Sequence, residues 1–537
     1  MADIQKLFQQ AVASYRAGQF SSAEQQFRHL LRFNAKHPDV LHILALCLQN
    51  QHQPKAAAEY LKTSLKYNPT HAPSRKSLIS LYIQQGNYAG AQTECDTLRE
   101  QQPEQFELYL LQAQLYRTMG LTDEALQAIE KARQRLAKPL PIVDYYLACI
   151  HYDLAQYEQT EAILQNLVSQ IPEYIDAHVA LNKLYWEHGP QEKFLTSLTK
   201  ALEKLPQSRQ LRYSLAAHLL MSNQPQACLE SCEETLKNLP DGAEFHHLKG
   251  SALMRLERLE DAVTAYEQAL KLQPDVLRHR IDYATTMMRI GEYETALQNL
   301  KAVEKFHPHS QEALAYKALC LHALGRAEAD ALNNYDQFVK IIPLQAPSTY
   351  ANTEQFMAEL AQALQGLHKT QQQPLDQSVR NGTQTVGNLF AQKLPIIAEF
   401  EAMIEAAAAQ YVNGLPTSST HPFLQRKSVG TRFTGAWSVR LAEKGFHSNH
   451  VHPEGWISCC TYIQLPPQVK PDDTTKAGWI QFGDPGMQLP NVKPKVHAVC
   501  PKVGYCVFFP SYFFHGTVPF QGDGIRMTAP CDISPAW

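Results

Sequence analysis

The chain has 537 residues, of which 44% are hydrophobic and 19% charged, and its formal net charge is −3. This length exceeds what one hydrophobic core usually holds, so we expect two or more domains. The composition excludes a disordered or fibrous chain. The nearly balanced charge gives no argument for nucleic acid or an anionic membrane surface, and we expect neither as a partner.

Targeting signals and cysteine usage point to one compartment. The start of the chain lacks the basic and apolar pattern of a signal peptide, and no stretch approaches the roughly 18 apolar residues of a membrane span. The 11 cysteines are scattered and form no CxxC motif, a pattern typical of reduced thiols. We therefore expect a cytoplasmic protein.

A 34-residue period runs through the first two thirds of the chain. Small residues recur in steps of 34 and continue in the same steps after a slip of one residue. These positions are Ala23, Ala57, Ala91 and Ala125, then Thr160, Cys228, Ala262 and Ala296, with the larger Phe194 in register between Thr160 and Cys228. Prolines follow by twelve positions at Pro69, Pro103, Pro240, Pro274 and Pro308. Small residues let two helices approach closely, and a proline ends the second one, so the period predicts tandem helical hairpins.

The local patterns GNYAGA (86–91) and GEYETA (291–296) resemble the tetratricopeptide repeat family. The phase extends from Gly291 to Gly325, which predicts an α-solenoid of about ten units over residues 1–343. Gly86 and Gly120 are expected in turns between paired helices. Stacked units form a superhelix with a concave surface. We expect a protein or peptide partner on that face, with an oligomerisation scaffold as the alternative.

The repeat phase is lost after residue 343. Residues 344–373 are rich in Pro, Ser, Thr and Gln, and we expect a linker or capping segment there. An amphipathic helix is predicted over about 394–412. From about 431 the pattern changes to period two, as in Gly435–Leu441, which predicts strands. The fold class is therefore multidomain α + β, with a C-terminal domain over 374–537 whose barrel begins at about 431.

Three histidines in this last part have the spacing of metal ligands. His450 and His452 are two residues apart and share one face of an extended segment. His515 follows a distant apolar strand. Two close ligands and one remote ligand leave coordination positions open, which suits non-haem iron, whereas a structural zinc site is closed and four-coordinate.

Arg526 supplies a candidate anion-binding group. If residues 521–524 form a hairpin turn, Arg526 lies opposite Pro519, roughly 13 Å along the strand from His515. A five-carbon dicarboxylate can span that gap and pair with the guanidinium. Thr528 faces the same side and can add a hydroxyl. Tyr462 is either a cosubstrate ligand or a core residue, and Arg440 either competes for the carboxylate or forms a structural ion pair.

The stretch from about 374 to 537 resembles the 2-oxoglutarate/iron(II) oxygenase superfamily, in particular a group with N-H-x-H-P and F-P-S-x-x-x-H-G motifs. The matching pieces are Asn449–Pro453, Gly478–Phe482, Phe509–Gly516 and Arg526. The resemblance implies a double-stranded β-helix, a jelly-roll or cupin-like fold. It also implies Fe(II) held by His450, His452 and His515, and 2-oxoglutarate held by Arg526, with O2 as the other cosubstrate. We expect a hydroxylase acting on a protein, peptide or carrier-bound substrate that the repeats recruit.

Several alternatives stay open at this point. The commonest pattern of the superfamily is His-x-Asp or His-x-Glu, and His452 with Glu454 also reads that way, in which case His450 is not a ligand. His447 and His497 are expected at the surface or in packing. The alternative functions are a repeat scaffold with a non-catalytic metal-binding barrel, and a cupin-like metalloenzyme that does not use 2-oxoglutarate.

Overall fold

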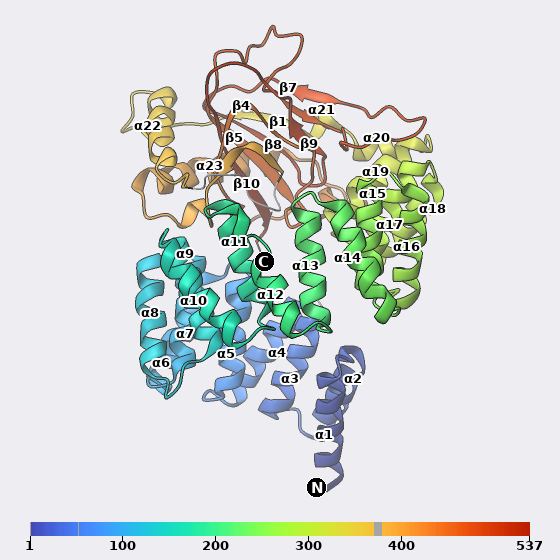
Figure 1. Ribbon diagram of the computed structural model, residues 1–537. Coiled ribbons are helices and arrows are strands. Elements are labelled where there is room, and N and C mark those ends of the chain that lie inside the picture. The colour runs from blue at the N-terminus through green and yellow to red at the C-terminus, as the bar shows by residue number, and fades with distance from the viewer. Residues whose placement is uncertain (1, 52, 370–377, 537) are drawn as a thin grey trace. The chain divides into compact units, whose positions relative to one another are not determined.

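The computed structural model describes residues 2–51, 53–369 and 378–536 (Figure 1). The chain divides into two compact units, residues 1–154 and 155–537. No helix in these described ranges is both long and apolar enough to cross a bilayer.

The first unit consists of helices. They are α1 (Ala2–Arg16), α2 (Phe20–Phe33), α3 (Pro38–Asn50), α4 (Pro54–Tyr67), α5 (Ala72–Gln84), α6 (Tyr88–Gln101), α7 (Phe106–Thr118), α8 (Thr122–Gln134) and α9 (Pro141–Asp153). Gly86 and Gly120 lie in the turns before α6 and α8, both with φ +69°, a left-handed backbone that glycine adopts without strain.

The second unit opens with further helices of the same kind. They are α10 (Tyr157–Gln170), α11 (Ile175–Glu187), the 3-10 helix η1 (Gln191–Lys193), α12 (Thr196–Lys204), α13 (Arg209–Met221), α14 (Pro225–Asn238), α15 (Ala243–Arg255), α16 (Leu259–Leu272), α17 (Leu277–Ile290), α18 (Tyr293–Phe306) and α19 (Gln311–Ala323). The predicted α-solenoid is confirmed in both units.

The periodic small residues share one structural position. Ala57, Ala91, Cys228 and Ala262 are each the fourth residue of the second helix of a hairpin, and each is fully buried. A larger side chain there would push the helix off its partner. Phe194 is the exception: it lies in the loop before α12, which is shortened to nine residues.

Polar side chains one repeat apart join neighbouring first helices in the second unit. Arg278 on α17 binds Glu312 on α19 at 2.8 Å, and His247 on α15 binds Asp282 on α17 at 2.7 Å. Each pair is separated by 34 or 35 residues. The repeat length therefore determines the spacing of these ion pairs as well as that of the apolar contacts.

The tenth repeat is incomplete. After α19 come only the short helices α20 (Glu328–Leu332) and α21 (Tyr335–Phe338), and then strand β1 (Lys340–Pro343), which pairs with β8 (Tyr505–Pro510). The expected domain boundary at 343 therefore cuts off a strand that belongs to the C-terminal sheet. Within the expected 344–373 segment, α22 (Thr353–Gln365) buries Phe356 and Met357 and packs against that sheet.

Two antiparallel sheets form the C-terminal domain, which confirms the predicted β-helix class. The larger sheet has the order β1-β8-β5-β10-β4-β2, with β3 also paired to β10, and the smaller has the order β7-β6-β9. Their remaining strands are β2 (Val379–Gln384), β3 (Thr431–Ala436), β4 (Val439–His447), β5 (Ile457–Gln464), β6 (Ile480–Phe482), β7 (His497–Val499), β9 (His515–Thr517) and β10 (Arg526–Pro535). Phe482 and Phe509 join the sheets, with ring centroids 4.9 Å apart. The predicted helix is α23 (Pro395–Gly414).

The expected hairpin between His515 and Arg526 is wrong. β9 pairs with β6 in the smaller sheet, whereas β10 lies in the larger sheet, where Arg526 is the register partner of Leu441 on β4. Residues 518–525 therefore cross from one sheet to the other, and His515 and Arg526 approach one cavity from opposite walls.

The loop between β6 and β7 accepts hydrogen bonds from the last repeats, so the barrel contacts those repeats within the second unit. The Tyr293 hydroxyl donates to Pro490 O at 2.6 Å, and His322 Nε2 donates to Lys493 O at 3.1 Å. Elsewhere Tyr512 donates to Leu332 O at 2.7 Å. These contacts hold helices α18 to α20 against the domain that carries the histidines.

Candidate metal centre

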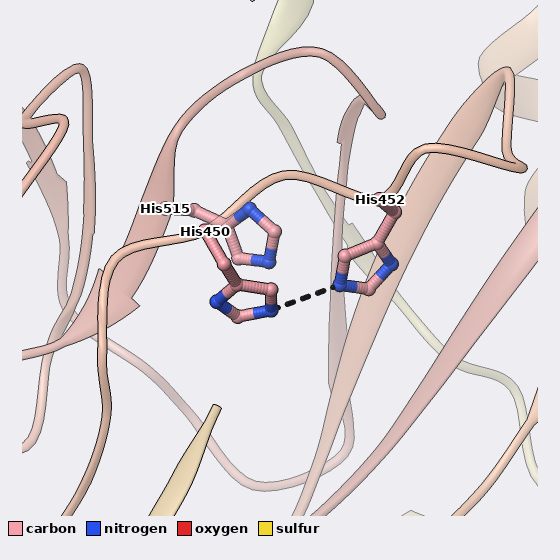
Figure 2. A group of neighbouring side chains, drawn as sticks. All are labelled: His450, His452 and His515. Atoms are coloured by element: carbon pink, nitrogen blue, oxygen red, sulfur yellow. Dashed lines mark hydrogen bonds between the residues drawn. The ribbon is translucent and has the colours of Figure 1, made fainter. Parts of the chain in front are cut away.

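His450, His452 and His515 converge on one point (Figure 2). One ring nitrogen from each lies within 4.8 Å of those of the other two, so the group can hold a metal ion. The Nε2 atoms of His450 and His452 are 3.1 Å apart, the contact that is dashed in Figure 2.

Backbone pairing places these side chains. His450 and His515 exchange two N–H···O=C bonds of 3.0 Å, and His452 N donates to Ser511 O at 3.0 Å. The segment 450–452 thus runs antiparallel to 511–515, although it forms only an isolated bridge rather than a full strand. Because side chains alternate in extended backbone, His450 and His452 point the same way.

The Nδ1 atom of each ring is occupied by a hydrogen bond to oxygen. His450 donates to Ser448 O at 2.8 Å, His515 to Phe513 O at 3.0 Å, and His452 to Asp532 Oδ1 at 2.5 Å. A proton fixed on Nδ1 leaves the lone pair of Nε2 free, which is how proteins orient histidine ligands. The close Nε2 atoms of His450 and His452 are then two facing lone pairs, an arrangement that a cation between them relieves.

Burial keeps His450 and His515 neutral. It lowers the pKa of His450 to about 3, with the neighbouring His452 adding to the effect, and it lowers the pKa of His515 well below its usual range. Neutral imidazole is the form that binds metal, so at these two rings no proton competes at neutral pH.

A cavity of about 200 Å³ opens beside the histidines, and Arg526 lies in its wall. Arg526 is 1% exposed, its Nε donates to Gly478 O at 3.2 Å, and it pairs with no carboxylate among the described residues. A buried charge without a counterion costs on the order of several kcal/mol. An anion bound in the cavity would remove that cost.

Thr528 lines the same cavity, two residues along β10 from Arg526. Its register partner on β5 is Tyr462, which is fully buried behind the wall with Arg526 Cζ 5.2 Å from its ring centroid. The Tyr462 hydroxyl has no hydrogen-bond partner in the described parts of the chain. An orphaned buried hydroxyl beside an unpaired guanidinium fits a site that a polar ligand completes.

The alternative candidates do not join the metal-ligand group. Glu454 is exposed and does not belong to the group of converging ligand atoms. Arg440 is the register partner of Met527, so its side chain lies on the sheet face opposite to that of Arg526 and outside the cavity wall. His497 packs on Tyr335, with ring centroids 5.9 Å apart.

His447 is placed differently from our expectation of a surface or packing role. It lines the cavity, its ring centroid lies 5.9 Å from that of His450, and its Nδ1 is 3.0 Å from Ser378 Oγ. The site therefore holds a fourth imidazole next to the three converging ones.

No role for Asp532 was predicted from the sequence. Its Oδ1 accepts hydrogen bonds from His452 Nδ1 and from Ser458 Oγ at 2.7 Å. A signal was available: Arg526, Thr528 and Asp532 share one face of a strand by their even spacing. The contact with His452 could not be predicted from local spacing, because the two residues are 80 positions apart in the sequence.

Comparisons with known proteins agree with both halves of the chain. Residues 435–532 match the family described as "Putative 2OG-Fe(II) oxygenase". Tetratricopeptide repeat models match residues 48–115, 106–132, 243–276 and 284–345. The chain thus carries multiple tetratricopeptide repeats and a C-terminal domain of that oxygenase family, for which Fe(II) and 2-oxoglutarate are the implied cofactor and cosubstrate.

Two of the solved structures that resemble the chain are tetratricopeptide repeat proteins, and the likeness is weak. A tetratricopeptide repeat protein from Parabacteroides merdae is 15% identical over 53% of this chain and 100% of its own, with a TM-score of 0.32. The P58(IPK) TPR domain is 15% identical over 60% of this chain and 98% of its own, with a TM-score of 0.20. No curated protein matches the chain.

Proposed function

Given tetratricopeptide repeats joined to a 2OG-Fe(II) oxygenase domain, we propose that the protein is an Fe(II)- and 2-oxoglutarate-dependent hydroxylase. Its substrate is a protein, a peptide or a carrier-bound molecule that the repeats recruit. The metal ligands are His450, His452 and His515, and Arg526 binds the distal carboxylate of 2-oxoglutarate.

One observation carries the proposal: three oriented imidazoles and an unpaired buried guanidinium share a single small cavity. A zinc site of structural type would need a fourth ligand, and a metal site that does not use a dicarboxylate would have no reason to bury Arg526 unpaired. The three-histidine set carries no ligand charge, so the counter-charge for iron comes from the bound acid.

Bound Fe(II) with 2-oxoglutarate and O2 supplies the oxidising power for hydroxylation of a C–H bond. The residues of the chain position the reactants. Arg526 and Thr528 hold the distal carboxylate, and Tyr462 lies behind them with its hydroxyl free to join this network. Asp532 fixes the tautomer of His452 through Nδ1, and Phe509 and Ile480 supply apolar wall that limits water.

Recruitment rests on the repeats. Tetratricopeptide repeats in general mediate protein–protein interaction. In the second unit, Tyr293, His322 and Leu332 of the last helices contact the barrel directly. A segment bound along these repeats is thereby held close to the cavity, which raises the effective concentration of that segment at the metal site.

The test is turnover of 2-oxoglutarate by the full chain. We expect aerobic release of succinate that requires added Fe(II), and we expect H450A and H515A to abolish it. Zn(II) in place of Fe(II) should give none. Absence of succinate release from an iron-loaded, folded protein would reject the proposed reaction.

A further inference from the structure

A polypeptide substrate is much larger than the cavity, whose volume is about 200 Å³. Arg526 and the histidines account for the inner end. A target group therefore enters past the rim, and the rest of the target molecule stays outside.

We call Trp437, Pro453 and Glu454 the rim. All three belong to the cavity wall, where Pro453 and Glu454 are exposed and Trp437 is partly exposed. The Trp437 ring lies tilted beside the His452 ring, with centroids 5.6 Å apart. Trp437 is only partly buried, so part of its indole is available to a ligand.

Glu454 is the charge at this rim. Its side chain is exposed and forms no ion pair with a cation of the described chain. Arg426, whose Nη1 donates to the backbone oxygen of Gly455 at 3.3 Å, forms no ion pair with Glu454. The rim thus combines an aromatic face with an unpaired carboxylate, the two groups that together favour an organic cation.

We propose that the target is a basic polypeptide segment, and that a lysine or arginine side chain lies between Trp437 and Glu454 when the residue to be hydroxylated enters the cavity. This inference rests on the proposed function and specifies its substrate class. An acidic segment would be repelled by Glu454, and a purely apolar one would gain nothing from its charge.

The test uses the full chain loaded with Fe(II) and 2-oxoglutarate, and five pools of nine-residue peptides. The pools share flanks of Ala, Gly, Ser and Pro, and differ only in a fixed central residue: lysine, arginine, norleucine, citrulline or glutamate. Norleucine and citrulline match the shapes of lysine and arginine without the charge. We measure succinate release above the peptide-free level and a mass gain of one oxygen in the peptide.

We expect the lysine or arginine pool to exceed its neutral counterpart by about tenfold, the size of a cation–π contact plus a partly exposed ion pair. E454Q should lower that ratio at least roughly threefold, and E454K should shift the preference towards the glutamate pool. E443Q, which alters an exposed carboxylate on β4 outside the cavity wall, is the matched control and should leave the ratio unchanged.

The two proposals fail in different ways. No peptide-free succinate release would reject the hydroxylase itself. Normal peptide-free release with an equal response to all five pools, including no response to any, would overturn the basic-segment inference. A cationic preference that E454Q and E454K leave intact would overturn the assignment of Glu454.

Discussion

The repeats pair their charges within the chain, whereas the cavity leaves a buried charge unpaired. In the second unit, Arg278 pairs with both Asp282 and Glu312, and Asp282 also accepts from His247, so each charge is matched within the chain. In the cavity, Arg526 has only a backbone oxygen for its Nε. Polar groups that the chain satisfies contribute to stability, whereas polar groups that it leaves unsatisfied are available to a ligand.

The strongest way to break this comparison is to remove Arg526 while keeping its volume. We expect R526M to lower kcat/KM for 2-oxoglutarate by at least about 100-fold, because the distal carboxylate loses a buried, charge-assisted partner. The apoprotein should unfold at the same or a higher urea concentration than wild type, since an unpaired buried charge is gone. A destabilised apoprotein with normal turnover would mean that Arg526 is structural.

Asp532 tests whether the cavity orients its metal ligands. We expect D532A to weaken Fe(II) binding by about 10- to 100-fold, because the tautomer of His452 is no longer fixed. D532N keeps an acceptor oxygen and should fall in between. S458A removes only the hydroxyl that supports Asp532 and serves as the control, with a smaller effect in a competitive chelator titration. Equal Fe(II) affinity in the variants D532A, D532N and S458A would contradict this role of Asp532.

His368, a buried histidine of the C-terminal domain, should make the free energy of unfolding depend on pH. It binds the hydroxyls of Thr383 and Ser438, and burial lowers its pKa to about 4, with Arg440 adding to the effect. The unfolded chain takes up this proton near pH 6.5, so stability falls as the pH drops from about 6.5 towards 4. At pH 5 the loss from this group is about 2 kcal/mol.

H368Q keeps polar atoms but cannot titrate in this range. Between pH 7 and pH 5, the variant should therefore lose less unfolding free energy than wild type, measured by urea denaturation at both values. Identical pH dependence of the two proteins would show that the pKa of His368 is the same in the folded and the unfolded state.

The smallest effect is expected in the repeats. R278M leaves Glu312 without its partner and deprives Asp282 of one of two. It should cost up to about 1 kcal/mol of unfolding free energy, because the Arg278 side chain is 47% exposed and water screens its pairs. The KM for 2-oxoglutarate should not change. R258M removes an exposed pair between the N-cap residue of α16 and Asp261. It is the control and should cost less, under about 0.5 kcal/mol. An altered KM in R278M would show that the repeats and the cavity are coupled.

The repeat array was predictable because its signal is redundant. A small residue every 34 positions lies at the same place in successive helices, so one irregular unit, at Phe194, did not hide the phase. The short strands β1 and β2 carry no such signal. Lys340–Pro343 has a single buried residue and Val379–Gln384 has little alternation, so their sheet positions come from partners far along the chain.

The centre was predictable as far as local spacing reaches. His450 and His452 are two residues apart, and Arg526 and Thr528 repeat that spacing on β10. What joins these pairs is the order of strands, which local pattern does not contain; hence the incorrect hairpin to Arg526 and the missed bond from His452 to Asp532. The place of His447 in the cavity wall depends on the same long-range pairing.

The most direct test of the account is an anaerobic optical titration of the full chain with Fe(II) and then 2-oxoglutarate. The account predicts a weak visible charge-transfer band that needs both additions, is lost in H515A, and requires a much higher 2-oxoglutarate concentration in R526M. A protein that binds Fe(II) but gives no band at saturating 2-oxoglutarate, or whose band forms equally well in R526M, would contradict it.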